Sequence, residues 1–329
     1  MNDYMTGSVI LIAAFILDIL LGEPRRYHPL VGFGNLTQKL ERLLNNKSNK
    51  KSNNKSNKKS NDKPWRTRLF GILGWSLLTL PLPLGYYLLH QDTLLFWCLD
   101  AVIVYSAIGY NSLVKHAKQI ADPLLNDDMQ QARHFCSYIV SRDTSNLSEQ
   151  EIARATTESV LENGHDAVIA SLVWFAIGGA PFVILHRLVN TLDAMWGYKN
   201  PQFLYFGWCA ARMDDLLGWP TAKVSSLLYA SQALWCRHTS MFNALRNGWR
   251  QGRQYKSLNG GWAMATGATV LNVSLGGQGI YDGKVVESVT LGQGPQVSTA
   301  DIVPSLNLVR NAAIIFIISC FLVSLIAAV

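Results

Sequence analysis

Ionisable side chains gather in residues 141–172, which read SRDTSNLSEQEIARATTESVLENGHDAVIASL. Ser148, with Glu151 three positions later, matches a capping box, so we predict that a helix begins there. At about 100° per residue, the ionisable side chains of this helix share one arc. The arc comprises Glu151, Arg154, Glu158, Glu162, His165 and Asp166, and the opposite side carries Ala153, Thr156, Thr157 and Val160.

Glu158 and Glu162 are the pair in this arc with a spacing that suits a metal ion. Carboxylates four residues apart on a helix can share a magnesium ion that also carries phosphate oxygens. The alternative is a solvated face, which is the ordinary role of a charged stripe. The setting favours a site, because the helix leads directly into an apolar segment and acids held beside membrane segments are functional candidates.

A second polar group lies in the stretches VNTLDAMWGY and AARMDDLLGWP, and it consists of Asn190, Asp193, Arg212, Asp214 and Asp215. Adjacent aspartates point to different faces of a helix, so Asp214 and Asp215 cannot easily serve one ion. One of them could simply be a salt-bridge partner of Arg212.

Two glycine-containing segments, residues 259–262 (NGGW) and 275–277 (LGG), are interpreted as loops whose backbone amides could approach an anion. Neither matches a P-loop or a dinucleotide-binding pattern. Near the start of the chain, the stretch LDILLGEPRRYHPL places Asp18 within an apolar run and Glu23 at its exit. Alternatively, Asp18 could be a plain helix-end residue without a role in the site.

The elements that carry these groups are expected to lie in a membrane. Hydrophobic residues make up 49% of the chain and charged residues only 16%, against about 25% charged in soluble domains. Residues 308–329 and 69–89 are apolar runs of about the length that spans a bilayer, the second kinked or broken by Pro81 and Pro83. Residues 94–110 and 8–22 are shorter runs, and we interpret the latter as a retained span.

Residues 167–189 form an apolar stretch that Gly178-Gly179-Ala180-Pro181 interrupts in its middle. Each half is too short to cross a bilayer, which predicts a re-entrant or core-buried helical hairpin. Residues 265–294 could hold one small β-hairpin. The fold class predicted is therefore mainly α: a multi-pass integral membrane protein with broken or re-entrant helices and a cytosol-facing helical active-site region.

Residues 45–63, NNKSNKKSNNKSNKKSNDK, form a low-complexity insertion that we predict to be disordered, because it has no apolar residue to bury. It lacks interleaved aromatic residues, which argues against nucleic acid as a partner. The basic charge of the region around it predicts that residues 23–68, 111–166 and 190–222 lie in the cytosol and that the C-terminal residue lies outside. The five cysteines show no paired spacing typical of zinc or disulfides.

Taken together, these stretches resemble the CobD/CbiB family of the cobalamin pathway, the adenosylcobinamide-phosphate synthases. The stretches that carry the resemblance are LDILLGEPRRYHPLVGFGN, SRDTSNLSEQEIARATTESVLENGHDAVIASLVWFAIGGAP, VNTLDAMWGY, FGWCAARMDDLLGWPTAKVSSLL, NGGW and LGGQGIYDGK, in family order. The chain departs from the family pattern around NGGW, where it has Leu258, Ala263 and Met264. This departure weakens any role assigned to Asn259.

The resemblance implies an ATP- and magnesium-dependent ligase that joins adenosylcobyric acid to (R)-1-aminopropan-2-ol phosphate, or a similar amino alcohol, as an amide. It implies one membrane-embedded domain over residues 1–329, in the cell inner membrane, with the lipid bilayer and other cobalamin-assembly enzymes as partners. A non-catalytic membrane sensor and a transporter related to this family are the alternatives.

The site residues that we expect on this basis have three roles. The catalytic candidates are Arg142, Asp143, Glu158, Glu162 and Asp166. The candidates for binding substrate or phosphate are Arg154, Asn190, Asp193, Arg212, Asp214, Asp215 and Asn259. Glu158 and Glu162 are also the expected magnesium ligands.

Overall fold

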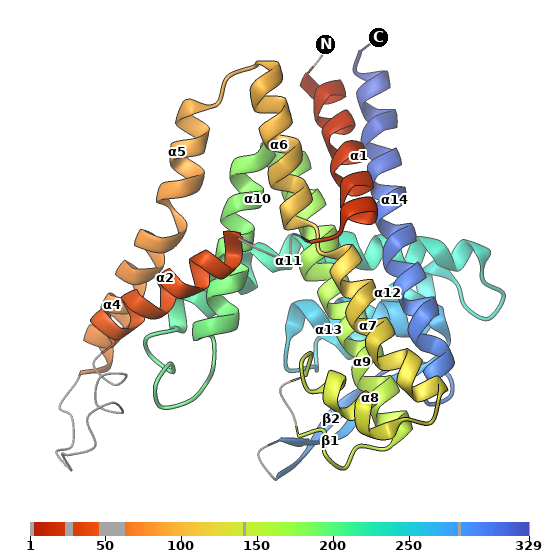
Figure 1. Ribbon diagram of the computed structural model, residues 1–329. Coiled ribbons are helices and arrows are strands. Elements are labelled where there is room, and N and C mark those ends of the chain that lie inside the picture. The colour runs from red at the N-terminus through yellow and green to blue at the C-terminus, as the bar shows by residue number, and fades with distance from the viewer. Residues whose placement is uncertain (1–2, 24–28, 46–62, 141–142, 282–283, 329) are drawn as a thin grey trace.

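The protein is built almost entirely from helices (Figure 1). The computed structural model describes residues 3–23, 29–45, 63–140, 143–281 and 284–328. Among them, the only strands are β1 (Ser274–Tyr281) and β2 (Lys284–Gly292), which pair antiparallel. A mainly helical fold and a small hairpin are thus confirmed, although the first part of residues 265–294 belongs to a helix. Arg142 and residues 46–62, most of the predicted insertion, lie outside the described residues.

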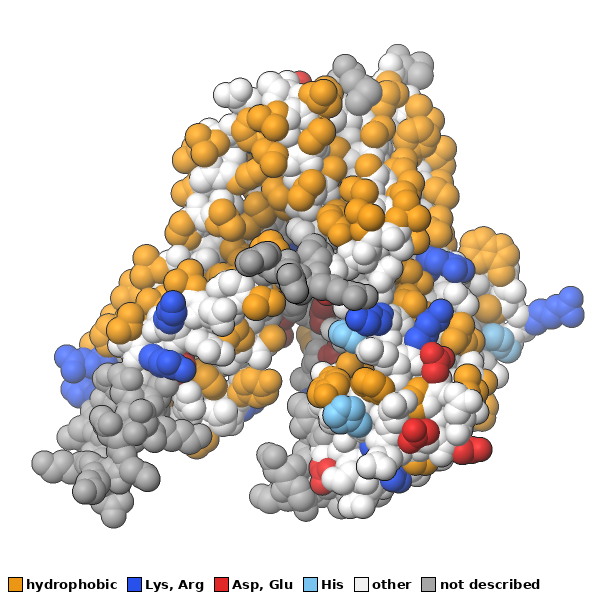
Figure 2. All heavy atoms as spheres, viewed as in Figure 1, with side chains coloured by type: hydrophobic (Ala, Val, Ile, Leu, Met, Phe, Trp, Pro, Cys, Tyr) orange, Lys and Arg blue, Asp and Glu red, His pale blue; other side chains and the backbone are white. Residues whose placement is uncertain are grey.

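Long apolar helices make up the half of the molecule that contains both termini (Figure 1). They are α1 (Asp3–Leu21), α5 (Pro81–Leu89), α6 (Leu94–Ala107) and α14 (Ile302–Ile326), and α4 (Pro64–Thr79) leads from the other half into α5. Within the described residues, four helical stretches are long and apolar enough to cross a membrane: Pro64–Leu89, Leu94–Leu125, Glu149–Trp196 and Thr299–Ile326. Figure 2 shows apolar side chains over the outer surface of this half.

These apolar side chains point outward rather than into a core. Leu88 on α5 is 71% exposed, Leu95 on α6 is 66% exposed and Ile326 on α14 is 75% exposed. Contiguous exposed apolar surface of this kind is unfavourable in water and suits contact with lipid. The helices therefore indicate a membrane protein.

Proline and glycine break the helices where the sequence predicted. Helix α4 ends at Thr79 and α5 begins at Pro81, because proline lacks the N–H that would continue the hydrogen-bond ladder. Helix α10 (Ala170–Trp196) changes direction at Gly178 and Gly179, and Gly179 has φ 67° and ψ −163°. Only glycine adopts that backbone conformation readily.

The two arms of α10 fold back on each other as a hairpin. His186 Nε2 lies 3.0 Å from the backbone oxygen of Asp166, although the two residues are 20 positions apart. In a straight helix they would be separated by about 30 Å. The helical hairpin predicted for residues 167–189 is therefore present in the fold, while its position in a bilayer stays a prediction.

The other half of the molecule carries most of the polar groups. It contains α2 (Pro29–Leu44), α7 (Tyr110–Leu125), α8 (Met129–Cys136), α9 (Glu149–Asn163), α12 (Met241–Gly252) and α13 (Leu258–Leu271). Figure 2 shows that a hollow divides this half into two lobes. Helix α11 (Trp208–Ser231) runs between the lobes, because it packs on α4 in one and on α13 in the other.

The described residues form two hydrophobic cores. The larger core joins α1, α6, α7, α9, α13 and α14, and includes Ile108, Ile152, Leu161 and Met264. The smaller core joins α4, α10 and α11 around Trp196, whose ring meets Phe206 edge to face at 4.7 Å between centroids. The end of α10 and the start of α11 belong to the smaller core, whereas the first arm of α10 and the end of α11 belong to the larger one, so these two helices join the cores.

Candidate active site

Helix α9 begins at the predicted capping box, because the Ser148 side chain accepts from the Glu151 N–H and the Glu151 carboxylate accepts from the Ser148 N–H. The side predicted to face away from the ionisable arc is buried at Ala153, Thr156, Thr157 and Val160. Burying this side leaves the acids of α9 directed toward the other elements of the same lobe.

A π-helical turn, η1 (Gly164–Ile169), follows α9 and carries two of the predicted ionisable residues. Its His165 is fully buried, and its Nδ1 lies 3.0 Å from Ser225 Oγ on α11. Its Nε2 lies 3.2 Å from Asp166 Oδ1. Turns of this type are frequent at functional sites because they redirect a side chain within an otherwise regular helix. This Nε2 atom forms no hydrogen bond among the described residues, so Ser225 holds the histidine in place beside the Asp166 carboxylate.

Asp166, Asp193 and Asp214 form the acid cluster, which draws on η1, the return arm of α10 and α11. Asn190 donates a hydrogen bond to Asp214 Oδ1 at 3.2 Å. The pKa of the Asp214 carboxyl is raised, first by burial and then by the charge of Asp166. The charge of Asp214 also repels the Asp193 carboxylate. The ionisable arc that ends at Asp166 and the second polar group, which includes Asp193 and Asp214, therefore come together in the fold.

Arg187, which the sequence reading missed, lies beside the acid cluster. The charges that act on its guanidinium most strongly are those of Glu23, Asp166 and Asp214. Its sequence signal was a single basic residue inside an apolar run, in VILHRLVN. Ionisable residues in apolar segments are functional candidates by default, so that signal could have identified Arg187.

The two adjacent aspartates of α11 separate as predicted. Asp214 turns toward Asn190, whereas Asp215 Oδ2 lies 3.9 Å from Arg212 Nη1 and both of these side chains are more than 60% exposed. Arg212 and Asp215 therefore form a surface pair at the edge of the cluster.

Glu158 and Arg154 hold the start of strand β1. The Gly276 N–H donates to Glu158 Oε1 at 2.8 Å, and Arg154 Nη1 donates to the Gly276 carbonyl at 2.8 Å. The glycine segment at residues 275–277 was expected to bring backbone amides to an anion, and the anion beside Gly276 is Glu158 itself. Because Glu158 Oε1 already accepts this backbone hydrogen bond, Glu158 is less suited to bind magnesium.

The NGGW segment is not a loop, as the sequence reading supposed, but the first turn of α13. Ser257 caps this helix by accepting from the Gly260 N–H at 3.2 Å. A Cβ atom on Gly260 would lie 2.5 Å from Glu162 Oε1, so the missing side chain leaves room for that carboxylate. Asn259 is buried and donates to the backbone oxygen of Asp215 at 3.0 Å. Asn259 thus joins α13 to α11.

Lys223 is a further basic group that the sequence reading did not single out. Its Nζ lies 2.8 Å from the centroid of the Trp262 ring, and burial lowers the pKa of its ammonium group to about 8. It comes from α11 and meets the first turn of α13, where Glu162 also lies. A cation is thus available on the α13 side of the site.

The Asp143 side chain is exposed and forms hydrogen bonds with a neighbour in the sequence. Its Oδ1 accepts from the N–H of Ser145 at 2.9 Å and from the Ser145 hydroxyl, and these bonds lower the pKa of the carboxyl. None of its described contacts reaches the acid cluster.

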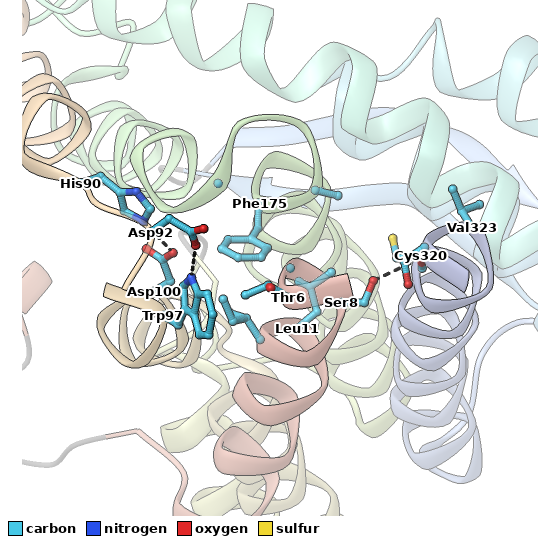
Figure 3. Close-up of a pocket in the computed structure, with 15 residues that line it drawn as sticks. Thr6, Ser8, Leu11, His90, Asp92, Trp97, Asp100, Phe175, Cys320 and Val323 are labelled. Carbon is cyan, nitrogen blue, oxygen red and sulfur yellow. Dashed lines mark hydrogen bonds and ion pairs between the residues drawn. The ribbon is translucent and has the colours of Figure 1, made fainter. Parts of the chain in front are cut away.

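A cavity of about 640 Å³ lies at the opposite end of the molecule, beside the tip of the α10 hairpin (Figure 3). Its carboxylates already have partners: Asp100 accepts from the Tyr86 hydroxyl at 2.6 Å and lies 3.1 Å from His90, and Asp92 accepts from Trp97 at 2.8 Å. The acid cluster is therefore the better place for chemistry that needs carboxylates.

Magnesium fits the acid cluster on physical grounds. Among the described residues no group of three or more His, Cys, Asp or Glu side chains is arranged as a metal site. Magnesium bound with a nucleotide needs only one or two carboxylates, since the phosphates and water complete its shell. Asp166 and Asp214 are half-buried carboxylates whose charges interact, and a divalent cation would relieve that repulsion.

These features define a class: a helical protein with long apolar helices and a partly buried cluster of acids and one arginine where its two lobes meet. Residues 11–309 match the family described as CobD/Cbib protein, and the chain belongs to that family.

Curated relatives agree with the family match. The chain is 44% identical to a Cobalamin biosynthesis protein CobD from Stutzerimonas stutzeri over 93% of this chain and 94% of that one. It is 42% identical to a protein of the same name from Chromobacterium violaceum, with 93% of each chain covered. A relative from Halalkalibacterium halodurans is 34% identical over 95% of each chain. No solved structure matches this chain.

Proposed function

We propose that the protein is an ATP-dependent ligase of cobalamin biosynthesis, which joins adenosylcobyric acid to (R)-1-aminopropan-2-ol phosphate as an amide. The observation that carries this proposal is the acid cluster beside Arg187, in a chain that belongs to the CobD/CbiB family. The curated relatives bear the name Cobalamin biosynthesis protein CobD, which supports the pathway.

The chemistry explains why such a cluster is needed. A carboxylate does not react with an amine at neutral pH because oxide is a poor leaving group, so ATP must first convert it to an acyl phosphate. Magnesium, when bound by Asp166 and Asp214 together with the nucleotide, would neutralise charge on the phosphates. Arg187 would stabilise negative charge on the transferring phosphoryl group.

The amine also needs a group that accepts its proton before it attacks the acyl phosphate. Glu162 suits this role, since its carboxylate lies over the first turn of α13 and feels the charge of Lys256 as well as that of Asp166.

The hollow between the lobes offers room for the corrinoid. Figure 2 shows acidic side chains at the upper end of this hollow, next to the apolar half of the molecule. A corrinoid has a large apolar face, which the membrane-facing half could cover while its reacting carboxylate points to the acids. We place the protein in the cell inner membrane, with the acid cluster on the cytosolic side where ATP is available.

The test is amide formation by the purified protein in detergent. We expect adenosylcobinamide phosphate to form from adenosylcobyric acid, (R)-1-aminopropan-2-ol phosphate, ATP and magnesium, with one ATP consumed for each amide. Asp214→Asn should lower turnover about 10²-fold or more. Asp127→Asn is the matched control, because Asp127 is exposed and its positive φ of 58° is a conformation that asparagine adopts readily.

A transporter of the same family is the second candidate, because the broken helix α10 resembles the discontinuous helices that bind substrates in transporters. Corrinoid uptake into sealed vesicles without amide formation would favour the transporter and overturn the ligase. Corrinoid binding without either activity would favour a sensor.

A further inference from the structure

A second cavity, of about 320 Å³, lies beside the acid cluster between α7, α9 and the return arm of α10. Its polar lining residues include Glu23, Ser112, His116, Tyr138, Asn163 and Arg187. Its volume is near the lower end of the range for small-molecule sites, which begins at about 300 Å³. A cavity of this size suits a small polar molecule and is too small for a corrinoid or a whole nucleotide.

Arg187 connects this cavity to the acid cluster. It lines the cavity, and its guanidinium is attracted by the charges of Asp166 and Asp214. Its Nε atom is buried and has no hydrogen-bond partner among the described residues. A buried donor without a partner is costly, and a guanidinium matches the geometry of phosphate oxygens. The cavity therefore presents a donor that an anionic ligand would satisfy.

His116 adds a second donor, because it stands on α7 and lines the same cavity. Ser112, one turn earlier on α7, adds a hydroxyl group. Two nitrogen donors and a hydroxyl around one small space are the usual surroundings of a bound phosphate.

Glu23 supplies the opposite charge. It lines the cavity and is the first among the acids whose charge acts on Arg187. Its Oε1 lies against Gly109, where an added Cβ would be only 3.3 Å away. A ligand with a phosphate at one end and an ammonium group at the other would meet a complementary charge at each end.

We propose that this cavity is the binding site of the small phosphorylated amine that the ligase consumes, with its phosphate on Arg187 and His116 and its ammonium group held by Glu23 before the amine reaches Glu162, which accepts its proton. The proposal rests on the proposed function. It also explains why the ligand is phosphorylated: the phosphate anchors the amine at Arg187, beside the acids where the acyl phosphate would form.

Direct binding tests this assignment without turnover. Calorimetry of the purified protein, with neither ATP nor corrinoid present, should show (R)-1-aminopropan-2-ol phosphate binding at least about tenfold more tightly than unphosphorylated (R)-1-aminopropan-2-ol. His116→Ala should weaken the phosphorylated ligand about tenfold and leave the unphosphorylated one unchanged. Lys118→Ala is the matched control, because Lys118 is exposed on the same helix and does not line the cavity.

Kinetics then separates this inference from the proposed function. His116→Ala should raise KM for the phosphorylated amine at least about tenfold, while KM for ATP and for adenosylcobyric acid stays within about twofold. An active ligase in which this change raises KM for ATP or for the corrinoid instead would overturn the cavity assignment and leave the ligase intact. Equal affinity for the two amines in calorimetry would also overturn it, whether or not the protein has ligase activity.

Discussion

At the scale of single residues, Glu158 and Glu162 occupy the same face of α9 in different surroundings. Glu158 accepts a backbone hydrogen bond from Gly276 and so supports strand β1. Glu162 lies over the first turn of α13, where glycine leaves space for its carboxylate. The first contact contributes to stability, whereas the second leaves a carboxylate available for chemistry.

We therefore expect opposite effects from two matched substitutions. Glu162→Gln should lower turnover about 10²-fold with the melting temperature unchanged, because only a charge is lost. Glu158→Gln should lower the free energy of unfolding by about 1–2 kcal/mol, because a charge-assisted hydrogen bond becomes a neutral one. Turnover and thermal unfolding of both variants measure this, with the exposed Glu287→Gln as control. Equal loss of turnover in both would contradict the separation.

The raised pKa of Asp214 predicts a dependence of stability on pH. Its folded-state pKa lies above the ordinary value of 3.8, so its stabilising contribution is complete below the unfolded pKa and is lost as pH rises through the folded pKa. Asp214→Asn should remove this loss, so the variant should gain melting temperature relative to wild type as the pH rises from about 4 to about 7.

Magnesium should offset the loss of stability of the wild-type protein at high pH. A bound cation offsets the repulsion among Asp166, Asp193 and Asp214, so the wild-type melting temperature should rise with magnesium at about pH 8 and the Asp214→Asn value should rise less. Parallel melting curves for the two proteins at all pH values would show that Asp214 does not carry this repulsion.

The sequence predicted the acids of this site better than its cations. The helical arc identified Glu162 and Asp166, and the second polar group identified Asp193 and Asp214, because each set is local in the sequence. Arg187 lies 21 positions after Asp166 in the numbering and becomes its neighbour only through the fold of α10. Local patterns do not contain that information.

At the scale of elements, the α10 hairpin depends on the backbone conformation of Gly179. Gly179→Ala should lower the free energy of unfolding by about 1–3 kcal/mol, because φ 67° with ψ −163° is accessible essentially only to glycine. Turnover should fall with it, since the return arm carries Arg187 and Asp193. Thermal unfolding and ligase assays measure both effects.

Gly85→Ala is the matched control for this prediction. Gly85 lies inside α5, and an added Cβ would contact nothing within 4 Å. Alanine should therefore stabilise that helix slightly, by up to about 1 kcal/mol. If Gly179→Ala were as well tolerated as Gly85→Ala, the sharp turn would not determine the hairpin.

Packing between helices explains why the first turn of α13 was predicted as a loop. Glycine disfavours helices in isolation, yet α13 includes Gly260 and Gly261 because its neighbours approach closely. A Cβ on Gly261 would lie 2.7 Å from the Gly252 carbonyl oxygen on α12. Tertiary packing thus overrides propensity here, whereas the capping box of α9 and the break at Pro81 depend on local chemistry and were predicted.

At the scale of the whole molecule, polarity divides the protein into two halves. The half with both termini has exposed apolar side chains, and the other half carries the acid cluster and the small sheet (Figures 1 and 2). Composition and apolar run length predicted this division because both act over whole helices. They do not predict how the two lobes meet, since that depends on contacts among α4, α10, α11 and α13.

The topology prediction follows from this polarity and from the basic loop after residue 38. The acid cluster should face the cytosol, and the turn between α5 and α6 should face outside. In a variant without the five native cysteines, Gln91→Cys should react with an impermeant maleimide in intact cells, because Gln91 is exposed in that turn. Tyr198→Cys, at an exposed position after the α10 hairpin, should react only after the membrane is opened. Labelling of Tyr198→Cys in intact cells would mean that α10 crosses the bilayer as a span, and the acid cluster could not then meet cytosolic ATP.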